Sequence, residues 1–177
     1  MPRTSKKHIL TAFVTVLAVN LWGAQPSDAF TVTDLRKLDA SSFTNDHWTA
    51  KPTKERVILA CTNCSVTTAL DIQIRRVDDG TEGRIRSGQT TAASMFDICK
   101  NNAKKTGSTC ISLKEANHKN AVGFVSSTDL FNNTFTSTYV IWQNGYILIM
   151  RAIAADQKEA TSIGKKAFQN LLPQLAS

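Results

Sequence analysis

The spacing of apolar residues predicts strands along most of the chain and amphipathic helices in two segments. From Thr68 to Arg75 apolar and polar residues alternate, which is the pattern of a strand with one face in water. Thr134–Trp142 and Tyr146–Ala154 are rich in β-branched and aromatic side chains, and Asn144-Gly145 between them is typical of a tight hairpin turn. Shorter apolar runs predict further strands at residues 56–60, 110–113 and 122–125.

Two segments repeat their apolar residues at helical spacing instead. The first follows Thr91, a good helix cap, and stops at Gly107; its apolar stripe consists of Ala92, Met95, Phe96, Cys99 and Ala103. The second follows Asp156 and ends near Pro173; its stripe consists of Ala160, Ile163, Ala167 and Leu171. Because each helix is apolar on one side only, we expect each to lie on a sheet.

The remaining segments have weaker patterns. Thr33-Asp34 is expected to cap a short helix that runs to Leu38, and Thr49–Thr53, which contains a proline, is expected to be a loop. Residues 78–83 form a turn cluster, after which Arg84–Ser87 is predicted to return as the hairpin partner of the strand before it.

Together these elements predict an α+β domain. Its sheet is mainly antiparallel and has about six or seven strands, on which the middle helix and the C-terminal amphipathic helix pack. No repeat, low-complexity tract or Pro/Gly-rich linker divides residues 30–177, so we expect them to form a single globular domain.

Residues 1–29 have the composition of a secretory signal peptide. Basic residues come first, an apolar run extends from Ile9 to Val19, and Ser27-Asp28-Ala29 places small residues before a cleavage site at Phe30. The run is too short to span a membrane, which takes about 20 residues, and no later stretch is long and apolar enough. We therefore expect a secreted or periplasmic protein with no membrane span after cleavage.

The charge of the chain favours an anionic partner. The formal net charge is +7, and removal of the leader takes away three basic residues and one acidic residue, which leaves +5. No P-loop, dinucleotide fingerprint or nucleophile elbow is present, and no cofactor is expected.

All four cysteines follow the predicted leader, so an oxidising compartment would allow them to pair. Four cysteines have three possible pairings. We favour Cys61–Cys64 and Cys99–Cys110, since the second bond would join the middle helix to the strand after it. Crossed pairings between the two segments are the alternative. The wide spacing of Cys99 and Cys110 does not fit a zinc site, and no metal is expected.

Cys61-Thr62-Asn63-Cys64 also suggests a second function. A C-x-x-C after an apolar strand resembles the active site of thioredoxin-like oxidoreductases, in which the following helix stabilises the first thiolate. Here a strand is predicted after Cys64, and the only later proline is Pro173, so the helix and the cis-proline loop of that family are both missing. We prefer a structural disulfide and keep a thiol–disulfide oxidoreductase as the alternative.

Three arginines form the candidate binding patch. In the predicted hairpin Arg75, Arg84 and Arg86 would share one face, and grouped guanidiniums suit phosphate or carboxylate partners. No aromatic residues alternate with them, so single-stranded nucleic acid is not indicated. His47 and His118 lie in polar segments and are a weak basis for a hydrolase. The preferred function is non-catalytic binding of a protein or an anionic surface component.

Overall fold

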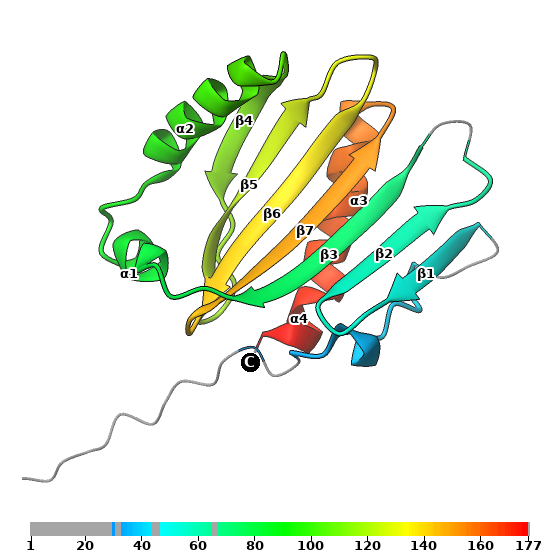
Figure 1. Ribbon diagram of the computed structural model, residues 1–177, viewed down its shortest axis with the longest axis horizontal. Helices are drawn as coiled ribbons and strands as arrows, with labels where there is room; N and C mark the ends of the chain where they lie inside the picture. The colour runs from blue at the N-terminus through cyan, green and yellow to red at the C-terminus, as the bar shows by residue number, and fades with distance from the viewer. Residues whose placement is uncertain (1–29, 31–32, 44–46, 65–66, 177) are drawn as a thin grey trace, which may run out of the picture.

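In the computed structural model, which describes residues 30, 33–43, 47–64 and 67–176, the chain forms a seven-stranded antiparallel sheet with helices on both faces (Figure 1). The α+β fold predicted from the sequence is confirmed. The strands are β1 (Trp48–Pro52), β2 (Arg56–Cys61), β3 (Ala69–Arg76), β4 (Thr109–Glu115), β5 (Val122–Asp129), β6 (Phe135–Gln143) and β7 (Tyr146–Ala154). The helices are the 3₁₀ turn η1 (Leu35–Lys37), α1 (Thr81–Arg86), α2 (Ala92–Lys105), α3 (Gln157–Asn170) and α4 (Leu172–Leu175).

The strand order is β1-β2-β3-β7-β6-β5-β4. The first three strands follow one another across the sheet; the chain then passes through α1 and α2 to the far edge and returns strand by strand from β4 to β7 (Figure 1). As a result β7, the last strand, is the central one. Asn144 and Gly145 form the β6–β7 turn with φ of 49° and 77°, the positive values that the predicted tight hairpin requires.

Helices α3 and α4 cover one face of the sheet and enclose the main core. Asp156 caps α3 with its side chain, and Ala160 and Ala167 of the predicted apolar stripe are buried against β6 and β7. Gly164 permits the close approach of the helix, because a Cβ there would lie 2.8 Å from the Ser137 Oγ on β6. The largest fully buried side chains of this core on the sheet are Leu59, Leu70, Ile72, Ile141, Leu148 and Met150.

Helices α1 and α2 lie toward the β4–β5 edge of the opposite face (Figure 1). Thr91 and Ser94 cap α2 reciprocally, each side chain bonding to the backbone N–H of the other. The two helices cover a smaller apolar cluster around Phe124, Trp142 and Ile147.

The rest of that second face carries no helix in the described part of the chain (Figure 1). We call it the open face. The strand registers place on it the outward side chains of Arg56, Ile58, Asp71, Gln73, Thr136, Thr138, Ile149, Arg151 and Ile153.

Two segments correct the sequence prediction. Most of Thr49–Thr53, predicted as a loop, belongs to β1, which pairs with β2 through its backbone while every side chain after Trp48 is exposed. No apolar alternation therefore marked this strand, and its proline is tolerated at the end of an edge strand. Arg84–Ser87, predicted as the hairpin partner of β3, lies in and just after α1, because β7 occupies the place beside β3.

The N-terminal segment enters the fold at Phe30. Residues 1–29, which carry the predicted leader, lie outside the described residues. Phe30, the first residue after the predicted cleavage site, is buried in the main core, and Asp34 caps η1 as the sequence predicts. Of the helices that the structure describes, none is long and apolar enough to cross a membrane.

Candidate functional site

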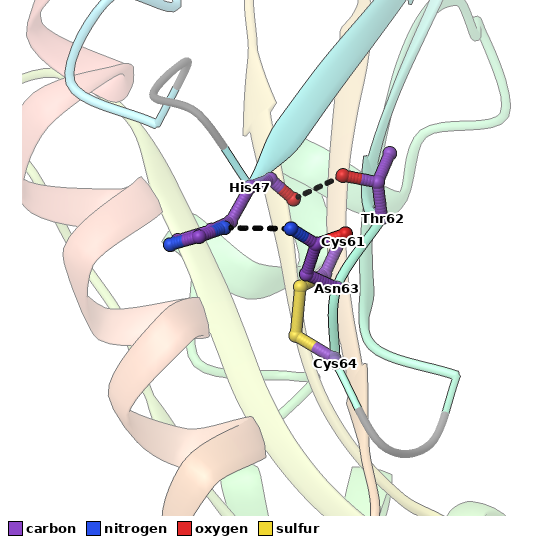
Figure 2. Close-up of a disulfide and its surroundings, with 5 residues drawn as sticks. All are labelled: His47, Cys61, Thr62, Asn63 and Cys64. Atoms are coloured by element: carbon purple, nitrogen blue, oxygen red, sulfur yellow. Dashed lines mark hydrogen bonds between the residues drawn. A yellow bond between two sulfur atoms is a disulfide. The ribbon is translucent and has the colours of Figure 1, made fainter.

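Cys61 and Cys64 form a disulfide at the end of β2 (Figure 2). The backbone N–H and the hydroxyl of Thr62 donate to the His47 carbonyl at 2.7 Å and 3.2 Å, and the Asn63 Nδ2 lies 3.2 Å from the His47 Nδ1. Cys64 is exposed and Cys61 is half-buried. The C-x-x-C motif is thus held at the surface, beside the start of the edge strand β1.

The surroundings of this disulfide differ from those of a thioredoxin-like site. Thr67 and Thr68 are not helical and β3 begins at Ala69, so the motif does not begin a helix that could stabilise a thiolate. Instead the Cys61 N–H donates to the Thr68 carbonyl at 2.9 Å, which continues the pairing of β2 with β3. The bond therefore staples the connection between two paired strands.

Cys99 and Cys110 form the second disulfide, so both bonds have the pairing favoured from the sequence. Cys99 lies on α2 and Cys110 is buried at the start of β4. This bond is a covalent link between α2 and the sheet. It holds the helix beside the cluster that contains Phe124 and Trp142.

The three arginines of the predicted patch are divided between a strand and a helix. Arg75 is on β3, whereas Arg84 and Arg86 are on α1, because the hairpin that would have grouped them does not form. Arg86 is ion-paired with Glu82 at 2.7 Å, and Arg84 donates to the Thr81 hydroxyl at 2.7 Å. Two of the three guanidiniums therefore already have partners within the domain.

Glu82 joins α1 to the β6–β7 turn. Its Oε1 accepts hydrogen bonds from Arg86, and its Oε2 accepts the Gly145 N–H at 3.1 Å. Burial raises the pKa of Glu82, but the bonds from Arg86 and the turn outweigh burial, so the pKa lies below its usual value. The ionised carboxylate thus positions α1 on the sheet.

His47 and His118 lie at opposite edges of the sheet. His47 precedes β1, and His118 is in the turn after β4, the other edge strand. The His118 ring packs edge-on against Phe168 of α3, with 6.1 Å between ring centroids. The two histidines are not brought together, so acid–base catalysis by a histidine pair has no geometric support.

The centre of the open face contains a neutralised ion pair. Asp71 of β3, which is 9% exposed, accepts two hydrogen bonds from Arg56 of β2, Nε–Oδ1 at 2.8 Å and Nη2–Oδ2 at 3.1 Å. A third comes from the Gln73 Nε2 at 2.8 Å. Because the guanidinium binds the carboxylate in a bidentate manner, the charges of Arg56 and Asp71 cancel.

Arg151 has no such partner. It lies on the central strand β7, in register with Asp71 across the β3–β7 pair, and it is exposed. Its guanidinium makes no hydrogen bond or ion pair with any other residue in the described ranges. An exposed guanidinium in the middle of a sheet face is a planar set of donors available to an anion.

A polar pocket of about 300 Å³ opens beside Arg151. Four hydroxyls line it, from Ser126 and Thr128 of β5 and from Thr136 and Thr138 of β6. Thr136 is 4% exposed and Thr138 is 9% exposed, yet none of the four hydroxyls bonds to another residue that the structure describes. The hydroxyls line the pocket together with the Arg151 guanidinium, so the pocket combines a cation with donors and acceptors that no described residue uses.

Sequence reasoning missed this pocket, although one signal was present. Arg151 is the single charged residue in the otherwise apolar segment Tyr146–Ala154. A lone charge within an apolar strand indicates that one face of the strand reaches solvent. The strand order, which places the hydroxyls of β5 and β6 next to Arg151, could not be derived from local patterns.

No family model matches the chain, and no curated protein matches its sequence. Within the described residues, no three His, Cys, Asp or Glu side chains are grouped as metal ligands. The pocket is therefore interpreted from its own chemistry.

Proposed function

We propose that the protein is an exported binding domain that holds an anionic ligand on its open face, in the polar pocket beside Arg151. The observation that carries the proposal is the exposed guanidinium of Arg151, which has no carboxylate partner among the described residues and stands beside four unused hydroxyls. Guanidinium and hydroxyl groups complement the oxygens of a carboxylate, phosphate or sulfate. The net charge of +5 that remains without the leader also favours an anionic partner.

Export is supported by the leader pattern and by two disulfides, which persist in oxidising compartments. N-terminal sequencing and intact mass of the protein recovered from the medium or periplasm test it. We expect an N-terminus at Phe30 and all four cysteines oxidised. Recovery of the uncleaved chain from the cytoplasm, with reduced cysteines, would contradict export.

An NMR titration with acetate tests the binding site. In ¹⁵N-labelled protein that begins at Phe30, acetate should produce saturable shifts at the Thr138 amide and the Arg151 Nε–H. Arg151→Gln deletes the Nε–H signal, so the Thr138 amide is the reporter for this variant. Its shift should be abolished because the substitution removes the charge and the guanidinium fork. Arg76→Gln is the matched control: it removes the same charge from β3, on the side that faces away from the open face, and should leave the shifts unchanged.

The patch of Arg75, Arg84 and Arg86 is the alternative location for an anionic partner, and the same titration distinguishes the two. Arg84→Gln should keep the acetate shifts, since its guanidinium is already engaged on α1. Shifts that disappear in Arg84→Gln and persist in Arg151→Gln would move the site to α1 and refute the proposal.

A further inference from the structure

The polar pocket adjoins an apolar pocket on the same face of the sheet. The apolar pocket, of about 290 Å³, lies between α2 and the sheet, and Ser126 and Thr138 line both. Along β6 the outward side chains run from Thr138 to Val140 and Trp142, so hydroxyls give way to apolar groups within two residues. The two pockets therefore form one site that is polar at one end and apolar at the other.

The apolar pocket has room for a further apolar group. Its apolar walls come from Met95 and Ile98 of α2, Leu113 of β4, Phe124 of β5, and Val140 and Trp142 of β6. Ile98 is 51% exposed although it lines this pocket. Hydrocarbon placed between α2 and the sheet would remove this apolar surface from water, which is favourable.

The charge of the site restricts the head group. Arg56 and Asp71 neutralise each other, so Arg151 supplies the net charge beside the polar pocket. One positive charge is balanced by one negative charge, which favours a carboxylate over a doubly charged phosphate.

The strand geometry sets the length of the ligand. Residues two apart in a strand are separated by about 7 Å, so Trp142 lies about 14 Å along β6 from Thr138, the neighbour of Arg151. A molecule that fills both ends therefore has its charge at one terminus and an apolar tail of this length.

We infer that the ligand is an amphipathic monocarboxylate, with its carboxylate at Arg151 and its hydrocarbon tail between α2 and the sheet. The binding of the carboxylate at Arg151 rests on the proposed function, whereas the binding of a hydrocarbon tail between α2 and the sheet is the new part of the inference. A small pocket of this kind, apolar with a few polar groups that orient the ligand, is typical of small-molecule sites.

Decanoate is the probe, and Trp142 is the reporter because it lines the apolar end. The protein begins at Phe30 and carries Trp48→Phe, so that of the three tryptophans only Trp142 remains. Decanoate below its micellar concentration should change the Trp142 fluorescence saturably. It should bind at least about tenfold more tightly than butyrate, which lacks the tail, and than decanol, which lacks the charge.

Two pairs of variants separate the contributions of head group and tail. Arg151→Gln should weaken decanoate binding by about tenfold or more and leave decanol unchanged, whereas Arg76→Gln should change neither. Ile98→Ser should weaken decanoate by about fivefold without altering the acetate shifts. Ile111→Ser is its matched control, because Ile111 is also exposed, at 37%, and does not line the pocket.

The outcomes distinguish the inference from the proposed function. Equal, Arg151-dependent affinities for butyrate and decanoate would overturn the tail and leave the anion site in place. Equal affinities for decanoate and decanol, unaffected by Arg151→Gln, would refute the anion site itself. Binding to phosphatidylglycerol vesicles without binding to monomeric decanoate would assign the face to a membrane surface and overturn the inference.

Discussion

The two disulfides should contribute unequally to stability, and their loop lengths set the order. Cys99 and Cys110 are 11 residues apart, and Cys61 and Cys64 are 3 apart. In the chain-entropy treatment a cross-link removes about 2.1 + 1.5R ln n cal/mol/K from the unfolded chain, where n is the loop length. At 25 °C this stabilises the fold by about 2.8 kcal/mol for the longer loop and about 1.6 kcal/mol for the shorter one.

The packing around the two disulfides should increase the difference between their contributions to stability. Cys110 is 7% exposed, and its bond to Cys99 links α2 to β4, the strand on which that helix mainly packs. Cys64, in contrast, is exposed after the end of β2. For a domain of this size 1 kcal/mol corresponds to about 2–4 °C in Tm, so we expect a loss of roughly 6–11 °C without Cys99–Cys110 and roughly 3–6 °C without Cys61–Cys64.

Thermal and urea unfolding of two double variants, each with both cysteines of one bond replaced by alanine, measure the two contributions. Near-UV circular dichroism adds a local readout, because Trp142 lies in the cluster that α2 covers. The Cys99→Ala, Cys110→Ala protein should lose part of this signal before global unfolding. An equal loss of stability, or a larger one in the Cys61→Ala, Cys64→Ala protein, would refute the reasoning from loop length and helix anchoring.

Three further predictions concern the helix contact with the sheet, the α1 carboxylate and the C-x-x-C motif. The Gly164→Ala protein should be about 1–3 kcal/mol less stable than the Gly83→Ala protein in urea unfolding. Both substitutions increase helix propensity, but only the one at Gly164 places its Cβ within 3 Å of another atom, and equal stabilities would contradict this close contact. Glu82→Gln should cost about 1–2 kcal/mol at pH 7. Because the pKa of Glu82 is lowered in the folded protein, its ionisation stabilises the fold above the unfolded-state pKa of about 4.3, and this contribution is lost as the pH falls through the folded-state pKa. The cost of Glu82→Gln should therefore shrink as the pH is lowered below the unfolded-state pKa; a cost independent of pH would exclude the charge as its cause. The Cys61–Cys64 bond should have a reduction potential below about −300 mV and should not catalyse insulin reduction, whereas turnover that Cys61→Ser abolishes would support the oxidoreductase alternative.

Local signals in the sequence were sufficient for the elements whose causes lie within a few residues. The β6–β7 hairpin follows from Asn144-Gly145, which adopt the positive φ that the turn needs. Helices α2 and α3 follow from the caps Thr91 and Asp156 and from an apolar stripe with the period of a helix. Such causes act along the chain, so they are visible without knowledge of the fold.

Elements whose conformation depends on distant parts of the chain could be identified only from the tertiary structure. β1 is a strand because its backbone pairs with β2, although all its side chains after Trp48 are exposed. Arg84 and Arg86 do not pair with β3, because β7, much later in the chain, occupies the place beside that strand. The sequence contained no local sign of either pairing.

The pocket illustrates the same division. Because successive side chains of a strand point to opposite faces, Arg151 lies on one face of β7, but this does not place it next to particular neighbours. The strand order brings β5 and β6 with their hydroxyls to Arg151. The Cys99–Cys110 bond holds α2 at the β4 edge, and no helix that the structure describes covers the face over Arg151. Whether a charged side chain becomes part of a site depends on what packs beside it, and that is decided by contacts between segments far apart in the sequence.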